Sequence, residues 1–496
     1  MSIRVETLRQ EAAELHRFIE PMVRMCTDLR RDYPVYTRPA QTFFKHIASL
    51  GLQTQEFLAR FPDDAAKDAR LTNSKRLKLL TLRTSWDSLH EYVGAVLDAD
   101  TLHLPGPLLT LFETLLRPIM ADDDADGTNG NGDQSGATEG GQLQAKTAKY
   151  EFAVFHTNQA NYLQVPSSIA RDVANDIALL IGGKSFPPDL GLVGIPYSSC
   201  NGLFLNCLIP HELGHIVYQE TELGEQIENS VDNLLEKMQN EIDPTARNLS
   251  WCREKLIAWG EEMFCDLFAI CLIGPAYSFA FSELMAASHI VGQEPGSPKE
   301  FFDFASHHPA GAFRFRVHAA LLVNLGWWDT ISDWTSAPIE VLRTRTDLRL
   351  YDLGLDALPP EGVQQNPLID CFSEVCNWLI DFVISAIPTD NALIQSFNDQ
   401  SPTISQYLKR AVVPSSIVLK QKGVVYPGPI VILNSTFRFY LEELPELIRS
   451  VEGDIKDDVE SRSKYSMRLE LWALKGIEDS RLLAYQEKWP SYPNPK

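Results

Sequence analysis

The segment LIPHELGHIVYQE, residues 208–220, places two histidines and a glutamate near the start of an otherwise largely apolar stretch. His211 and His215 are four residues apart, a spacing that puts two side chains on one face of a helix. Ionisable groups in a buried helix are costly unless something such as a metal ion compensates them. Pro210 is tolerated only in the first helical turn, so we expect this helix to begin near Asn206.

The polar residues of this segment have the chemical properties that a zinc site needs. His211 and His215 can bind the ion through neutral imidazoles, and a third protein ligand would leave the fourth position to a water molecule. Glu212 is rotated off the histidine face but stays near the open side of the metal, where its carboxylate can take a proton from that water. A random chain of this composition contains His-Glu-x-x-His about once in sixty, so the motif is informative without being decisive. Gly214 costs about 1 kcal/mol of helix propensity against alanine, which is explained if another element passes close to this turn.

A third ligand is expected on a second helix, in WGEEMFCDLFAICLIGP, residues 259–275. On a helical wheel Glu262 and Asp266 share one face with small neighbours, whereas Glu261 is turned away from that face. We therefore predict Glu262 as the third metal ligand and Asp266 as the acceptor of the free ring N–H of a ligand histidine. Taken alone, Glu-x-x-x-Asp would indicate only a solvated helix face, so this prediction depends on the upstream motif.

His-Glu-x-x-His followed by Glu-x-x-x-Asp on a later helix resembles the gluzincin metallopeptidases, the thermolysin-like clan, over about residues 150–330. The resemblance implies a zincin-like core with zinc (Zn2+) as its cofactor. It also implies a small sheet before residue 207 whose edge strand pairs with a peptide substrate. The implied roles are His211, His215 and Glu262 as zinc ligands, Glu212 as the general base, and Asp266 as the partner of the first histidine.

The resemblance leaves the subfamily open, because the interval between His215 and Glu262 is wider than in thermolysin itself. The metzincin pattern requires a third histidine soon after the second, but His215 is followed by Ile-Val-Tyr-Gln-Glu, so that alternative is excluded. Two other interpretations stay open. The protein could be a non-catalytic scaffold or interaction protein that has the zinc site, or the histidines could be core residues that bind no metal.

A peptidase of this kind also needs a donor for the oxyanion of the tetrahedral intermediate. The segment SHHPAGAFRFR, residues 306–316, places a histidine pair just before an expected helix. Gluzincins often supply a His or Tyr downstream of the glutamate ligand, so His308 is the candidate. The alternatives are His307, Tyr277 and Tyr218. In the competing interpretation the histidine pair only caps the helix, and we expect Arg314 and Arg316 to pair with buried acids rather than with a substrate.

The predicted fold class is α+β and predominantly helical. Residues 1–118 contain apolar residues at three- and four-residue steps, which is typical of amphipathic helices. Residues 119–147 contain an acidic, Gly-rich run and are predicted to be a disordered linker or loop. Residues 148–330 are predicted to form the zincin-like catalytic core, and residues 331–496 a mainly helical C-terminal region.

Several short segments carry more local predictions. Extended structure is expected in YEFAVFH, at Tyr162–Val165, in GLVGIPYSS and in GLFLN, the last at residues 202–206. The segment SSIARDVANDIALLI is expected to be a helix. In the C-terminal region, Ile430–Leu433 could form a strand.

Charge and composition limit the classes of partner and compartment. Acidic residues number 66 against 44 Lys and Arg, and the resulting net charge of −22 repels phosphate backbones, so no nucleic acid partner is expected. The most apolar run, residues 267–281, is too short for a membrane span and is interpreted as buried core. The eight cysteines include no Cys-x-x-Cys pair, which is typical of thiols in a reducing compartment and indicates the cytoplasm. The expected partner is a peptide or protein substrate.

Overall fold

The structure is a computed structural model that describes most of the 496 residues. The described residues are 3–32, 38–66, 72–102, 106–116, 119, 151–157, 163–165, 167–183, 190–196, 202–238, 249–289, 308–309, 311–334, 367–387, 391–419, 423–452 and 459–488. The chain divides into two compact units. The first unit is Met1–Gly106 with Thr147–Asn201, and the second is Pro107–Lys146 with Gly202–Lys496.

The predicted regions and these units have different boundaries. The predicted core at 148–330 has residues in both units, because the first unit extends to Asn201. The predicted linker at 119–147 lies outside the described residues except for Ile119. The described chain is mostly helical with little strand, which confirms the predominantly helical fold class.

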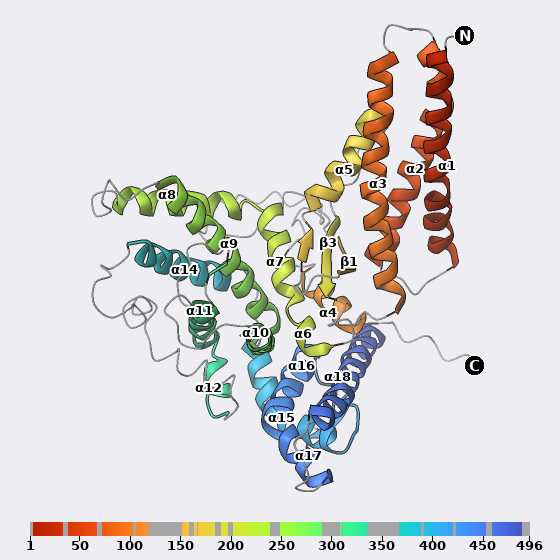
Figure 1. Cartoon of the computed structure of the whole chain (residues 1–496). Coiled ribbons are helices and arrows are strands. Elements are labelled where there is room, and N and C mark those ends of the chain that lie inside the picture. The colour runs from red at the N-terminus through yellow and green to blue at the C-terminus, as the bar shows by residue number, and fades with distance from the viewer. Residues whose placement is uncertain are drawn as a thin grey trace, which may run out of the picture. The chain divides into compact units, whose positions relative to one another are not determined.

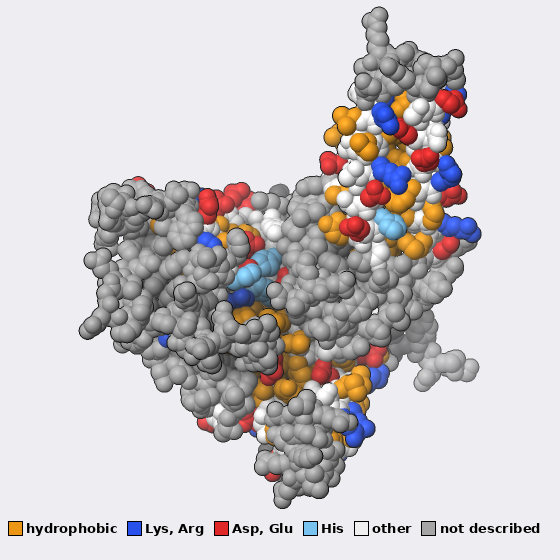
Figure 2. All heavy atoms as spheres, viewed as in Figure 1, with side chains coloured by type: hydrophobic (Ala, Val, Ile, Leu, Met, Phe, Trp, Pro, Cys, Tyr) orange, Lys and Arg blue, Asp and Glu red, His pale blue; other side chains and the backbone are white. Residues whose placement is uncertain are grey.

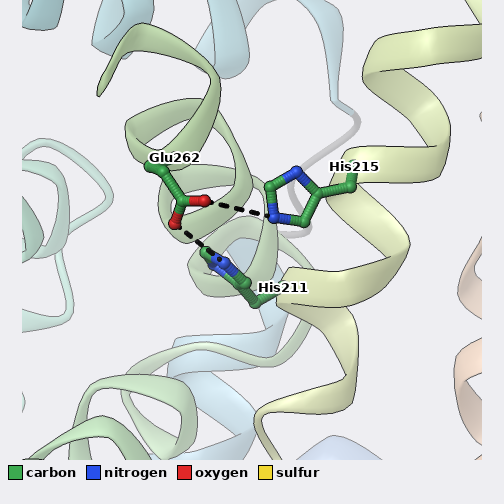
Figure 3. Close-up of side chains that lie close together, drawn as sticks. All are labelled: His211, His215 and Glu262. Carbon is green, nitrogen blue, oxygen red and sulfur yellow. Dashed lines mark ion pairs between the residues drawn. The ribbon is translucent and has the colours of Figure 1, made fainter. Parts of the chain in front are cut away.

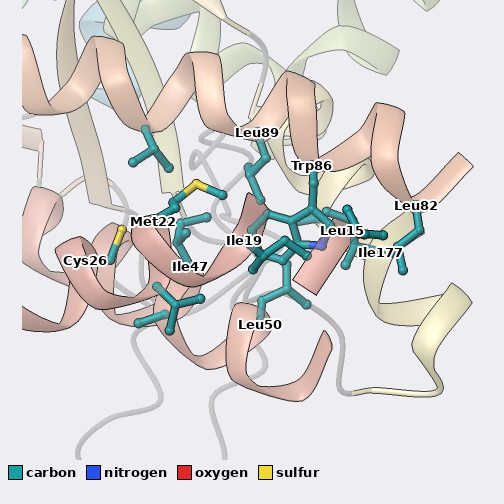
Figure 4. Packing of buried hydrophobic residues seen from close by; sticks show 14 of the residues in the cluster. Leu15, Ile19, Met22, Cys26, Ile47, Leu50, Leu82, Trp86, Leu89 and Ile177 are labelled. Atoms are coloured by element: carbon teal, nitrogen blue, oxygen red, sulfur yellow. The ribbon is translucent and has the colours of Figure 1, made fainter. Parts of the chain in front are cut away.

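Long helices form most of the first unit. They are α1 (Ile3–Asp32), α2 (Arg38–Ala66), α3 (Thr72–Leu102) and α5 (Ser167–Ile181). The apolar positions predicted from the periodicity face a common core, where Trp86 of α3 lies with Leu15 and Ile19 of α1 (Figure 4). Gly51 allows α2 to lie close to α1, because a Cβ there would come 2.1 Å from Val23 Cγ2. The predicted helical character of the N-terminal region is confirmed.

A small mixed sheet also belongs to the first unit. Its strands are β1 (Glu151–Thr157), β2 (Leu163–Val165) and β3 (Leu190–Pro196). The strand β3 lies in the middle, parallel to β1 and antiparallel to β2. Val193 and Ile195 of β3 are fully buried, as expected for a central strand. The three segments before residue 200 that were predicted to be extended therefore form one sheet.

The second unit is helical apart from one antiparallel pair of strands among its described residues. In chain order its elements are α4 (Gly106–Leu116, which begins at the unit boundary), α6 (Leu203–Asn206), α7 (Ile209–Glu220), α8 (Leu223–Met238), α9 (Leu249–Ile273), α10 (Pro275–His289), α11 (Gly311–Asn324), α12 (Trp328–Ile331), α14 (Pro367–Ala386), α15 (Asn391–Lys409), β4 (Ile417–Leu419), β5 (Gly423–Val425), α16 (Pro429–Arg438), the π-helix η6 (Phe439–Glu443), α17 (Leu444–Glu452) and α18 (Val459–Lys488).

Helix α9 is the central element of the second unit. Helices α7, α8, α11 and α14 all pack against it (Figure 1). Residues 263–270 of α9 are buried without interruption, so this helix meets protein on all sides. The predicted buried run at 267–281 is confirmed, with Cys271 alone half-buried among these residues. No helix in the described parts of the chain is long and apolar enough to span a membrane.

Buried Asn434 of α16 connects the end of α9 to the start of α10. Its Nδ2 donates to the Ile273 carbonyl and its Oδ1 accepts from the Ala276 N–H, both at 2.9 Å. Between these two residues the backbone of Gly274 adopts φ +68°, which breaks the helix. One amide therefore satisfies two backbone groups that the break would leave unpaired.

The expectation of extended structure at residues 202–206 is wrong. The segment forms the short helix α6, whose first N–H, that of Leu203, donates to Glu470 of α18 at 2.5 Å. The ring of Phe204 packs edge-on against Phe437 of α16, with ring centroids 4.6 Å apart. Contacts distant in sequence thus hold a helical turn that the local sequence did not indicate.

Two further boundaries differ from the predictions. Helix α7 begins at Ile209 rather than near Asn206, although Pro210 does lie in its first turn as expected. The segment Ile430–Leu433 is not a strand but part of α16, which Pro429 starts and whose face toward the core is fully buried. Proline at the first helical position is compatible with a helix, so the Pro-containing segment was misread.

Candidate metal centre

Helix α7 directs His211 and His215 toward α9, where Glu262 faces both rings (Figure 3). His211 Nε2 lies 3.4 Å from Glu262 Oε2, and His215 Nε2 lies 3.5 Å from Glu262 Oε1. One ligand atom from each of the three residues lies within 4.8 Å of the other two. The structure therefore brings together the three side chains that were predicted as ligands.

Gly214 makes this approach of α7 to α9 possible. A Cβ at residue 214 would come 2.8 Å from Cys265 Cα, closer than real Cβ atoms approach another atom, and 3.0 Å from Cys265 Cβ, which is also very tight. The backbones of the two helices can lie this close only because residue 214 has no side chain. The expectation that another element passes close to this turn is confirmed.

Each histidine has a carboxylate on the ring nitrogen that faces away from Glu262. His211 Nδ1 lies 2.9 Å from Asp266 Oδ1, and His215 Nδ1 lies 2.9 Å from Glu261 Oε1. A carboxylate accepts but does not donate when ionised, so both rings donate from Nδ1. A neutral ring in that state has its lone pair on Nε2, which is the tautomer that binds a metal through Nε2.

The arrangement of donor atoms fits a metal ion. When both rings are neutral, their two Nε2 lone pairs face the carboxylate oxygens of Glu262, and such acceptor pairs repel unless a proton or a metal ion lies between them. Glu262 Oε2 is buried and accepts no hydrogen bond of good geometry in the described part of the chain. Ligands bound to zinc at about 2.0–2.1 Å in tetrahedral geometry are roughly 3.3 Å apart, close to the observed separations. The imidazole and carboxylate set is also one that zinc prefers.

Four side chains from three helices surround the Asp266 carboxylate, which is fully buried. Arg314 of α11 forms a fork on it, with Nε donating to Oδ2 and Nη2 to Oδ1, both at 2.6 Å. His211 Nδ1 and the Tyr277 hydroxyl of α10 also donate to Oδ1, and His318 Nε2 lies 3.0 Å from Oδ2. Burial by itself raises the pKa of Asp266, but Arg314, His318 and His211 outweigh it and hold this pKa well below the ordinary value.

Glu262 is held as an anion by its surroundings. His308 Nδ1 lies 3.0 Å and Arg314 Nη1 3.8 Å from Glu262 Oε2. Burial raises the pKa of Glu262, but His211, His308 and Arg314 together lower it well below its ordinary value. An ionised carboxylate is the form that a metal needs, so these neighbours favour binding.

The remaining predicted residues lie at different distances from this cluster. Glu212 is buried on α7 beside His211, and His308 reaches Glu262 although 61% of its side chain is exposed. Histidine side chains are visible together on the face in Figure 2. Tyr218 packs against Phe264, and burial raises the pKa of the Tyr218 hydroxyl above its ordinary value. His307 lies outside the described residues.

The predicted pairing of arginines is confirmed for Arg314 through its fork on Asp266. Arg316 is buried too, and its pairing stays a prediction. Tyr277, an alternative for the oxyanion donor, is completely buried and hydrogen-bonded to Asp266. Burial and then the charge of Asp266 raise the pKa of Tyr277 well above its ordinary value, so this hydroxyl remains a donor to that carboxylate.

Two members of the cluster, Glu261 and His318, were not predicted from the sequence. Glu261 was placed on the wrong side of α9, yet its Oε1 reaches His215, because a long side chain spans the 100° between adjacent helical positions. His318 is the second of these residues. It lies four residues after Arg314 in an apolar helix, the same spacing of ionisable groups that singled out His211 and His215.

Comparisons with protein-family models, with curated proteins and with solved structures found no match to this chain.

Proposed function

We propose that this protein is a zinc-dependent metallopeptidase of the gluzincin type, which hydrolyses peptide bonds in a peptide or protein substrate. One observation carries the proposal: His211, His215 and Glu262 converge from two helices, and each histidine Nε2 lies 3.4 or 3.5 Å from a Glu262 oxygen, near the roughly 3.3 Å expected between ligands of tetrahedral zinc. The hydrogen bonds on both Nδ1 atoms support it, because they prepare both rings to bind through Nε2. The proposal includes the expectation that the fold around this site is a zincin-like core.

His211, His215 and Glu262 would hold the ion and leave one position open. Zinc at this position supplies a Lewis acid that lowers the pKa of a bound water and polarises the scissile carbonyl. Glu212, buried next to His211, accepts the proton of the attacking water and delivers it to the leaving amine. His308, exposed and in contact with Glu262, can donate to the oxyanion that forms on the substrate.

The free thiols support a reducing compartment such as the cytoplasm for this enzyme. Cys26, Cys207, Cys265, Cys271 and Cys376 are free. Burial raises the pKa of Cys26 and of Cys271 to about 12, so neither is a reactive thiolate.

Metal content and turnover of a Glu212→Gln variant test the proposal together. The wild-type protein, purified without added zinc, should contain about one zinc ion per chain. Glu212→Gln should keep the metal and lose at least about 100-fold in the cleavage rate of a quenched-fluorescence peptide library, the loss typical of a missing general base.

Glu222→Gln serves as the matched control, because Glu222 is exposed just beyond the end of α7. It should keep both metal and turnover. A wild-type protein without metal would overturn the zinc site. A protein with metal that cleaves no peptide would overturn the peptidase and leave the zinc-containing scaffold.

A further inference from the structure

We propose that Arg314 is a positioning residue of the metal site, which holds Asp266 in the orientation that aims His211 Nε2 at the metal. The inference rests on the metal site of the proposed function. Arg314 itself would not touch the metal and would act through Asp266 and His211.

Arg314 has the geometry of a fixed support. Its planar guanidinium forms two bonds of 2.6 Å to the two oxygens of Asp266. The guanidinium carbon lies 4.4 Å from the centroid of the Phe281 ring, so an aromatic face packs against the group from α10. Only 8% of Arg314 is exposed. A bidentate pair of this kind defines the plane of the carboxylate as well as its position.

That orientation matters because Tyr277 competes for the same atoms. The Tyr277 hydroxyl donates to Asp266 Oδ1, and it also lies 3.2 Å from His211 Nδ1. While Asp266 stays in place, both His211 and Tyr277 donate to it. If Asp266 turned away, the hydroxyl could donate to Nδ1 of the neutral His211 ring, the form that binds metal, and the single ring proton would then occupy Nε2. A histidine in that tautomer cannot bind a metal through Nε2.

Charge is a second route by which Arg314 could act. Its Nη1 lies 3.8 Å from Glu262 Oε2, so a cation here also lowers the repulsion between Glu262 and Asp266. Lysine would restore that charge as a single point but could not form the fork. Comparison of Arg314→Lys with Arg314→Met therefore separates orientation from charge.

The experiment measures zinc affinity by competition with a chelator and the absorption spectrum of the Co2+-substituted protein. Arg314→Met should bind zinc about 10–100-fold more weakly than wild type, the usual effect of losing a residue that supports a ligand. Arg314→Lys should lose nearly as much zinc affinity as Arg314→Met, if the orientation of Asp266 matters more than the positive charge. Both variants should change the Co2+ spectrum, which reports the geometry of the ligands and which a general loss of stability leaves unmoved.

Arg316 provides the matched control. Arg316 is buried on the same helix as Arg314. Because it lies two residues further along, its side chain points about 200° around the helix from that of Arg314. Arg316→Lys and Arg316→Met should keep the zinc affinity within about threefold and leave the Co2+ spectrum unchanged. If these variants weaken zinc as much as the Arg314 variants do, helix α11 supports the site only as general structure and the proposal is overturned.

A double-mutant cycle tests whether Arg314 acts through Asp266. In an Asp266→Asn background, Arg314→Met should cause less than about threefold further loss of zinc affinity, because the carboxylate that it orients is already gone. Losses that simply multiply would overturn the proposal. Wild-type affinity and an unchanged Co2+ spectrum in Arg314→Met would overturn it while leaving the metal site intact. Absence of metal binding in the wild-type protein would instead overturn the proposed function first.

Discussion

Gly214 of α7 and Cys265 of α9 are in backbone contact: a Cβ on Gly214 would lie 2.8 Å from Cys265 Cα. This contact sets the distance between the helix that carries His211 and His215 and the helix that carries Glu262. The spacing of the three ligand atoms, 3.4 and 3.5 Å from the histidines to the carboxylate, therefore depends on a residue that has no side chain.

Gly214→Ala should push α7 away from α9. We expect a loss of about 1–3 kcal/mol in the free energy of unfolding, typical of overpacking, together with weaker zinc binding. Chemical denaturation and chelator competition measure the two effects. Gly94→Ala is the control, since Gly94 lies within α3 and a Cβ there meets nothing within 4 Å. That substitution should instead stabilise the protein by about 0.5–1 kcal/mol. Equal effects of the two substitutions would contradict the packing argument.

Glu261→Ala should weaken zinc binding by about tenfold, because it removes the acceptor that fixes His215 through Nδ1. Glu261→Gln keeps a carbonyl oxygen at this position and should lose clearly less. Isothermal calorimetry of the two variants against zinc gives the comparison. Glu254→Gln, also on α9 but about two turns before Glu261, serves as the control. An Ala variant with wild-type affinity would show that His215 does not depend on this carboxylate.

Zinc binding should release a proton from His211. In the metal-free protein, burial lowers the pKa of His211, but Asp266 and Glu262 outweigh burial and raise it to about 10. The ring is therefore protonated at neutral pH, and a metal must displace the proton on Nε2. We expect about one proton released per zinc ion at this residue, measured as the dependence of the calorimetric enthalpy on the ionisation enthalpy of the buffer. A binding enthalpy that is equal in all buffers would contradict the release of a proton from His211.

The same raised pKa gives the metal-free protein a pH-dependent stability. Because the pKa in the folded state lies above the ordinary 6.5, the stabilisation is fully present below about pH 6.5 and is lost as the pH rises through 10. The Tm of chelator-treated protein should therefore fall over this range more steeply than the Tm of zinc-loaded protein. In His211→Gln the difference between the two forms should disappear.

Asn434→Leu should destabilise the second unit by about 2–4 kcal/mol, because it leaves the Ile273 carbonyl and the Ala276 N–H buried without a partner. Urea denaturation followed by far-UV circular dichroism measures the loss. Asn324→Leu removes one exposed hydrogen bond, to the Ala320 carbonyl at the end of α11. Its effect should stay within about 0.5 kcal/mol. A neutral Asn434→Leu would mean that the α9–α10 junction needs no such connection.

The helical periodicity of the sequence predicted much of the fold. Apolar steps of three and four residues predicted the N-terminal helices, and residues at such steps, among them Leu82, Trp86 and Leu89, are fully buried. The periodicity did not predict α6 or the nature of Ile430–Leu433, because short apolar segments take their structure from the contacts they meet. The same holds in the site, because the contact between Glu261 of α9 and His215 of α7 cannot be predicted from the position of Glu261 on its own helix.

What the sequence by itself determined is the pair of histidines on one helical face, with Gly214 between them and two acids one turn apart on a later helix. These features depend only on residue spacing along a single helix, which a fixed rise and rotation convert into position. Only the tertiary structure decided how far α9 lies from α7, which carboxylate reaches which ring, and that Arg314 and His318 of α11 meet Asp266. Those relations depend on how separate helices pack, and side chains distant in sequence acquire a distance only after the core has formed around them.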